Sequence, residues 1–233
     1  MIPIYAMPKR MYKSDYLSRF HPGVYYHVYN RTNNREPLFK DEDDKKVFLS
    51  RYRYYLTEYV DLYAWCLMEN HFHLLIRVKA EEIILRQIQQ SHQEDHIAAH
   101  RHFLQSPESN RDFHPVVERQ FTRMFTSYSA KFNLKNKRTG NLFHRPFNRV
   151  EVFDEDHLVW LVYYIHSNPV KHRVLTDFTT YQWSSYRTIL SEKPTLLLRN
   201  DVLEWFGGLE KFLEFHIPKS NCPEEVEYLN IER

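Results

Sequence analysis

Glycine and cysteine are scarce in this sequence, and long apolar runs are missing. Only 4 glycines occur in 233 residues, which argues against a glycine-rich nucleotide-binding loop. Cys66 and Cys222 lie far apart in the sequence and suggest neither a disulfide framework nor a zinc cluster. No apolar run is long enough to span a membrane, and no signal peptide precedes the first polar residues. We therefore expect a protein of the reducing cytoplasm, with no membrane partner.

Charge is distributed unevenly along a chain that is otherwise typical of a globular protein. Hydrophobic residues make up 42% of the sequence and the formal net charge is only +2. Residues 119–149, however, contain eight Lys or Arg and no Asp or Glu, whereas residues 192–233 contain nine acidic and five basic residues. This asymmetry predicts a local surface that binds a polyanion. The alternative is a solvated helix surface, which usually carries acidic residues as well.

Hydrophobic periodicity predicts an α+β domain. The order of elements suits a ferredoxin-like antiparallel sheet with packed helices. The predicted domains are an N-terminal arm (1–20), a catalytic domain (21–190) with a His-rich insertion (about 88–115), and a small helical C-terminal extension (191–233). Strands are expected at 24–29, 60–68, 71–78 and 147–153. Helices are expected at 41–59, 117–134 and from 155 to Pro169. Asp41 and Asp154 are the expected N-caps, and Pro169 is expected to end the last helix.

The His-rich insertion carries a regular histidine pattern. His92, His96 and His100 recur at a spacing of four, which would place them on one face of a helix. A metal site would be compatible with that spacing, but no acidic general base follows in the manner of a zinc protease. We interpret the segment as an exposed helix without a direct role in chemistry.

A His-x-His pair lies in the predicted hairpin. Two apolar runs flank the short turn at Glu69 and Asn70, and the second run begins with His71-Phe72-His73. Because side chains alternate along a strand, His71 and His73 are expected to project from the same exposed face. Two such imidazoles can chelate one divalent cation. An isolated His-x-His is more often a pair of ordinary strand histidines, so other features have to support a metal site.

The last predicted helix supplies a phenol and an amide on one face. Tyr164 and Asn168 are spaced i, i+4 and therefore lie about one turn apart. Together they can present a nucleophile and an oxygen ligand to one metal. Tyr163 points roughly 100° away around the helix, and we interpret it as a core residue.

Cations recur along the predicted helix at 117–134 and in the turn that follows it. Aromatic residues and Met124 form one helix face, while basic residues follow another. Basic residues interleaved with aromatic rings suit single-stranded nucleic acid, because cations track the backbone and rings stack on bases. The predicted DNA-binding residues are Arg119, Arg123, Lys131, Lys135, Lys137, Arg138 and Arg145.

Four segments in fixed order resemble the tyrosine transposases of the HUH class, and most of all their repeat-associated (REP-associated) branch. The segments are MENHFHLLI at 68–76, RTGNLF at 138–143, YIHSNPVK at 164–171 and WSSY at 183–186. The resemblance extends over about residues 22–186. The His-rich insertion departs from it, because it is longer than is usual in the family.

The resemblance implies a metal-dependent enzyme that cleaves and rejoins single-stranded or hairpin DNA through a 5′-phosphotyrosine intermediate. It assigns Tyr164 as the nucleophile, His71 and His73 as ligands of a divalent metal (Mg or Mn), and Asn168 as the third ligand. A homodimer is left open. Two alternatives also remain: a domesticated nucleic-acid-binding protein that keeps the fold without strand transfer, and a nickase related to replication initiators or relaxases.

Overall fold

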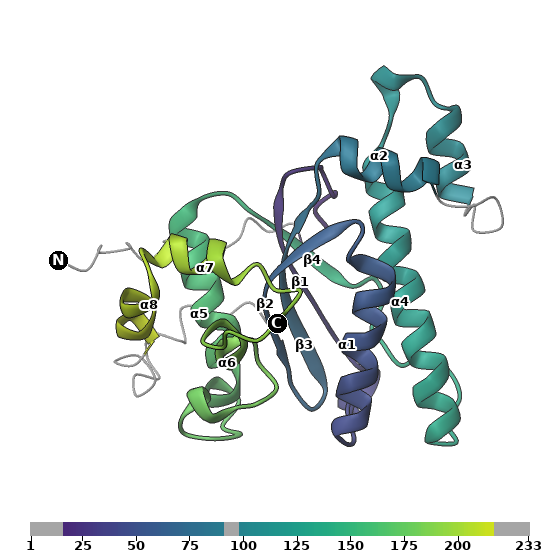
Figure 1. Cartoon of the computed structure of the whole chain (residues 1–233). Coiled ribbons are helices and arrows are strands. Elements are labelled where there is room, and N and C mark those ends of the chain that lie inside the picture. The colour runs from purple at the N-terminus through teal and green to yellow at the C-terminus, as the bar shows by residue number, and fades with distance from the viewer. Residues whose placement is uncertain (1–15, 91–97, 217–233) are drawn as a thin grey trace.

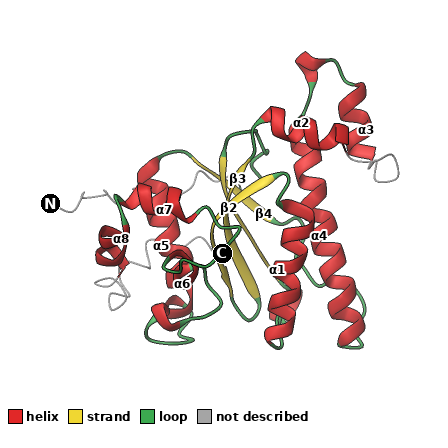
Figure 2. Ribbon diagram, in the orientation of Figure 1, coloured by secondary structure: helices red, strands yellow, loops and turns green. Residues whose placement is uncertain are grey.

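A four-stranded antiparallel sheet forms the centre of the computed structural model, which describes residues 16–90 and 98–216 (Figures 1 and 2). The strand order is β2-β3-β1-β4. With helices after β1 and β3, this is the ferredoxin-like arrangement that the sequence predicted. The predicted arm falls outside the described residues except for 16–20. The strands are β1 (Tyr25–Arg31), β2 (Val60–Leu67), β3 (His71–Val78) and β4 (Asn148–Val152).

Two long helices cover one face of the sheet. They are α1 (Glu42–Leu56) and α4 (Phe113–Lys135), which pack against each other (Figure 1). Phe72 of β3 points toward this layer: its ring centroid lies 4.9 Å from that of Phe48 in α1 and 5.6 Å from that of Phe125 in α4. This face therefore holds an aromatic core.

The other face of the sheet is covered by α5 (Glu155–Lys171), which packs on β2 and β3. Figure 1 shows it on the side opposite to α1 and α4. The described part of the C-terminal extension packs outside α5, where Phe215 contacts Trp160 at a centroid distance of 5.1 Å. The extension contains α7 (Arg199–Phe206) and α8 (Leu209–His216). The short elements η4 (Phe178–Thr180) and α6 (Tyr186–Ile189) precede it.

Helix α5 does not end at Pro169, contrary to the prediction, but continues to Lys171. Proline lacks an N–H, so in this position it forgoes only the hydrogen bond to the carbonyl of Ile165. The helix tolerates that loss in its last turn, and His172 N donates to the carbonyl of Asn168 at 2.9 Å. At the other end, the side chain of Asp154 accepts from His157 N at 2.7 Å, as expected of an N-cap.

The Trp-Ser-Ser-Tyr motif joins β2 to α5 and α8 through a buried hydrogen-bond chain. Trp65 N donates to Ser185 Oγ at 2.9 Å, and Ser185 Oγ contacts His166 Nε2 at 2.8 Å. His166 Nδ1 in turn contacts His216 Nε2 at 3.1 Å. His216 Nδ1 donates to the carbonyl of Phe212 at 2.8 Å, so in the neutral rings His166 Nδ1 donates to His216 and Ser185 donates to His166 Nε2. Burial lowers the pKa of His166 well below its ordinary value. This motif therefore has a structural role.

The insertion between β3 and α4 contains α2 (Glu81–Gln90), α3 (Ala98–Gln105) and η3 (Glu108–Asn110). His92 and His96 lie outside the described residues. The expectation of an exposed helix is wrong at His100, which is buried and whose Nε2 accepts from Gln120 Nε2 at 3.1 Å. The reason is that α3 packs against α4. None of the helices in the described part of the chain is both long and apolar enough to cross a membrane.

Candidate active site

The two histidines of the His-x-His pair lie on the face of β3 that α5 covers. Their ring centroids are 5.2 Å apart. The ring of His73 meets that of Tyr164 edge to face, with a centroid distance of 5.5 Å and an interplanar angle of 84°. Strand alternation thus places both imidazoles as predicted. The expectation that they are exposed is wrong, because His71 is 8% and His73 0% exposed beneath α5.

Each imidazole is oriented by a neighbour through its Nδ1 atom. His71 Nδ1 lies 2.7 Å from Asn70 Oδ1, which can only accept, so this nitrogen carries the proton. In a neutral ring the lone pair of His71 is then on Nε2, the atom that a metal would use. His73 Nδ1 lies 2.9 Å from His27 Nε2 on the neighbouring strand. Such outer contacts fix the ring orientation of metal-binding histidines.

Tyr164 and Asn168 are both fully buried on α5, one turn apart. Asn168 Nδ2 donates to the main-chain carbonyl of Tyr164 at 3.0 Å. Asn168 Oδ1 is buried and has no hydrogen-bond partner among the described residues. A buried amide oxygen without a partner is costly, which marks it as a candidate ligand. Within that part of the chain, no group of three His, Cys, Asp or Glu side chains is suited to a metal ion, so the amide would be the third donor.

Tyr163 lies in a different layer, as predicted. Its ring meets those of Trp160, Phe178 and Phe215 edge to face, at centroid distances of 6.1, 5.9 and 5.8 Å. These contacts belong to the core between α5 and the C-terminal helices. Of the two adjacent tyrosines, Tyr164 is therefore the one directed toward the histidines.

Lys171 is a site residue that the sequence reasoning missed. Its Nζ donates to the hydroxyl of Tyr164 at 3.3 Å and lies 4.8 Å from the centroid of the same ring. The i, i+7 spacing, which spans two helical turns, could have revealed the pair. It was overlooked because the helix was predicted to end at Pro169. An ammonium group in this position stabilises negative charge on the phenol oxygen.

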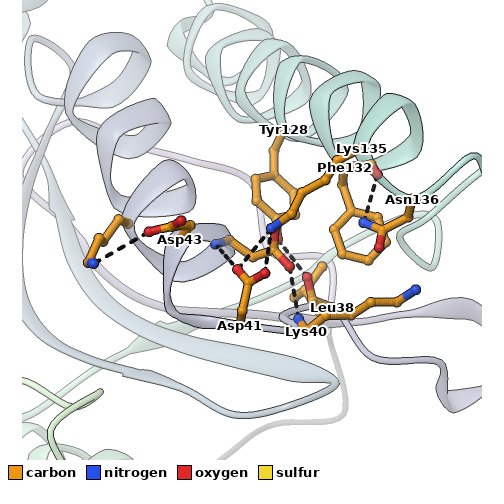
Figure 3. A network of polar contacts seen from close by, with 10 residues as sticks. Leu38, Lys40, Asp41, Asp43, Tyr128, Phe132, Lys135 and Asn136 are labelled. Atoms are coloured by element: carbon orange, nitrogen blue, oxygen red, sulfur yellow. Dashed lines mark hydrogen bonds and ion pairs between the residues drawn. The ribbon is translucent and has the colours of Figure 1, made fainter.

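The predicted DNA-binding residues fall into two groups, and three of them are engaged within the protein. Lys135 Nζ contacts Asp41 Oδ2 at 2.7 Å (Figure 3) and Asp44 Oδ1 at the same distance, and these hydrogen bonds raise the pKa of Lys135. Arg138 Nε donates to Glu36 at 2.8 Å. The Arg123 guanidinium lies over the ring of Tyr55, 5.3 Å from its centroid, and Nη1 contacts Gln120 Oε1 at 3.4 Å. Lys135 in particular links α4 to the start of α1.

The second group is exposed and comprises Arg119, Lys131, Lys137 and Arg145. Their side chains have no hydrogen-bond or ion-pair partner among the described residues. Arg119 and Lys131 are on α4, whereas Tyr164 is on α5. The two helices cover opposite faces of the sheet (Figure 1). Arg145 lines a cavity of about 660 Å³ between α4 and the loop that follows it. The structure therefore does not bring the α4 cations together with the candidate nucleophile.

A second cavity, of about 490 Å³, opens directly beside His71. Tyr16, Arg31, Arg35 and His172 also line it. The sequence did not predict a role for Arg31 and Arg35, because they lie outside the acid-free segment at 119–149 from which the DNA-binding residues were predicted. The position of Arg31 depends on the pairing of β1 with β3, which places it opposite His71.

A ferredoxin-like sheet whose His-x-His pair faces a helix tyrosine is the arrangement expected of the HUH class. Residues 21–106 match the family described as IS200-like transposases. The match includes His71 and His73, while Tyr164 and Asn168 lie beyond it. The resemblance to tyrosine transposases is thereby confirmed.

One solved structure is reported as similar, and no curated protein matches the chain. The structure is that of a REP-associated tyrosine transposase bound to a REP hairpin. It is 15% identical, with a TM-score of 0.49, and the alignment covers 78% of this chain and 89% of that one.

Proposed function

We propose that this protein is a DNA strand transferase that cleaves and rejoins single-stranded or hairpin DNA, with Tyr164 as the nucleophile. The observation that carries the proposal is the position of Tyr164: its ring rests on His73 and its hydroxyl accepts from Lys171, in a chain that matches IS200-like transposases over residues 21–106. The catalytic unit is proposed to span residues 21–190.

The reaction exchanges one phosphodiester for another. The Tyr164 oxygen forms a bond to phosphorus and loses its proton, while the bond from phosphorus to the 3′ oxygen breaks and that oxygen takes up a proton. The products are a 5′-phosphotyrosine and a free 3′-OH, so the reverse attack restores a DNA strand. Lys171 stabilises the phenolate that develops on Tyr164 during attack.

His71, His73 and Asn168 are the residues that would hold a divalent metal. The fit rests on the buried Asn168 Oδ1 without a hydrogen-bond partner among the described residues and on the proton at His71 Nδ1, which leaves the lone pair of the neutral ring on Nε2. A bound Mg or Mn ion would polarise the scissile phosphate and neutralise developing charge. Asn70 and His27 hold the two rings in place for that purpose.

The test is covalent capture of labelled single-stranded and hairpin DNA in the presence of Mg²⁺ or Mn²⁺, read on a denaturing gel. Tyr164→Phe is expected to abolish the adduct while DNA binding persists, and Tyr163→Phe is the matched control that retains it. Mass spectrometry should place the DNA on Tyr164. An adduct on another residue would overturn the assignment. Binding without any adduct would favour a domesticated binding protein.

A further inference from the structure

The cavity beside His71 has a size and a lining suited to one nucleotide. Its volume of about 490 Å³ falls in the range of about 300–1,000 Å³ that is typical of small-molecule sites. Tyr16 offers an aromatic ring, and Arg31 and Arg35 offer two guanidinium groups. A flat ring with cations beside it is the combination that binds unpaired nucleotides.

Strand register places this cavity next to the candidate active site. Residues directly opposite each other in neighbouring strands share a face of the sheet. Tyr29 lies opposite His73 and also opposite Asn148, and Arg31 lies opposite His71. The cavity, which Tyr29 and Asn148 also line, therefore opens on the same face as the two histidines.

Tyr16 is held at the cavity by main-chain pairing rather than by its own side chain. Arg149 N donates to the Tyr16 carbonyl at 2.8 Å, and Ser18 N donates to the Arg149 carbonyl at 3.1 Å. The buried Arg149 guanidinium strengthens this contact: Nε donates to the Ser18 carbonyl at 2.8 Å, and Nη2 is 3.0 Å from Glu118. The Tyr16 side chain remains 40% exposed, so its ring is accessible to a base.

Arg31 and Arg35 are available for phosphates. Neither guanidinium has a hydrogen-bond or ion-pair partner among the described residues, whereas Arg138 and Arg149 pair with carboxylates. Arg35 also has a φ of +56°, in the left-handed region that non-glycine residues rarely adopt. Strained backbone of this kind gathers at functional sites. In this protein the left-handed backbone conformation occurs at Arg35, which lines the cavity.

We propose that this cavity receives one unpaired nucleotide of the DNA strand next to the reacting phosphate. Its base stacks on Tyr16, and the adjoining phosphates contact Arg31 and Arg35. The inference rests on the proposed function, since it takes the strand to pass His71. Tyr16 is then a binding residue that fixes the register of the strand, and it takes no part in bond making.

Photocrosslinking tests the stacking contact without requiring catalysis. The probe is oligo-dT with a single 5-iodouracil, mixed with the full chain in EDTA, irradiated and mapped by mass spectrometry. The crosslink is expected on Tyr16. Tyr16→Ala should remove it and weaken binding of the oligonucleotide by about 5- to 150-fold, the loss typical of one stacked base. Tyr54→Ala is the matched control, because Tyr54 is an exposed tyrosine (72%) on α1. A crosslink elsewhere, or equal binding by Tyr16→Ala and wild type, would overturn the proposal.

The salt dependence of binding tests the two arginines. Replacing Arg31 and Arg35 together by Gln should lower the slope of log affinity against log salt by about 0.7 for each lost phosphate contact. Arg53→Gln, on the exposed surface of α1, should leave the slope unchanged. An unchanged slope in the Arg31/Arg35 variant would also refute the inference.

The outcome is separable from that of the proposed function. If the wild-type protein forms no covalent adduct but does crosslink through Tyr16, the proposed strand transfer is rejected and the nucleotide site is supported. If an adduct forms on Tyr164 but no crosslink forms to Tyr16, strand transfer is supported and the nucleotide site is rejected.

Discussion

Replacing Lys171 by Met is the sharpest perturbation of the candidate active site. The substitution removes the ammonium group 3.3 Å from the Tyr164 hydroxyl and keeps an unbranched apolar side chain on the last turn of α5. A hydrogen bond to a charged group contributes about 1.5–3 kcal/mol. If that stabilisation develops with negative charge on the phenol oxygen, its loss slows adduct formation by about 10- to 150-fold.

The assay is single-turnover formation of the covalent adduct at saturating single-stranded DNA. Saturation separates a slower chemical step from weaker binding, which is measured in parallel by fluorescence anisotropy. Lys171→Arg should recover part of the rate, because it restores a cation. Arg173→Met is the matched control: Arg173 is exposed and lies two residues further on, so its loss should leave the rate unchanged. A Lys171→Met protein with the wild-type rate, or with a deficit that is explained wholly by binding, would refute the role given to Lys171.

Three further predictions concern buried and ion-paired residues. His73→Ala should lower the free energy of unfolding by about 1–3 kcal/mol in chemical denaturation, because it strips a buried ring from its contact with His27; unchanged stability would contradict the burial. Burial lowers the pKa of His157 to about 4, so the unfolded chain binds a proton that the native state does not. Stability should therefore fall by as much as about 3 kcal/mol as pH drops from about 6.5 to 4, and a His157→Gln variant with the same pH dependence would count against this. Lys135→Gln should leave the salt dependence of DNA binding unchanged, because Lys135 is engaged by Asp41 and Asp44, whereas a flatter slope would show that it contacts phosphate.

The sequence by itself was sufficient for most features that depend on local periodicity. The exception is the i, i+7 pair of Tyr164 and Lys171, which was missed because the helix was predicted to end at Pro169. Alternation along a strand put His71 and His73 on one face, and i, i+4 spacing put Tyr164 and Asn168 on another. The same periodicities gave the order of strands and helices, from which the ferredoxin-like sheet follows. These relations involve residues a few positions apart, so backbone geometry fixes them wherever the element forms.

Only the tertiary structure decided which distant residues meet the site. Strand register brought His27 to His73 and Arg31 to His71. Packing also decided which cations are engaged by carboxylates. The basic segment itself contains no acidic residue, and the acids that pair with Lys135 lie about ninety residues earlier, at the start of α1. Side chains so far apart in sequence are brought together by the burial of apolar surface between layers. That burial depends on the whole set of packed faces, and local spacing does not encode it.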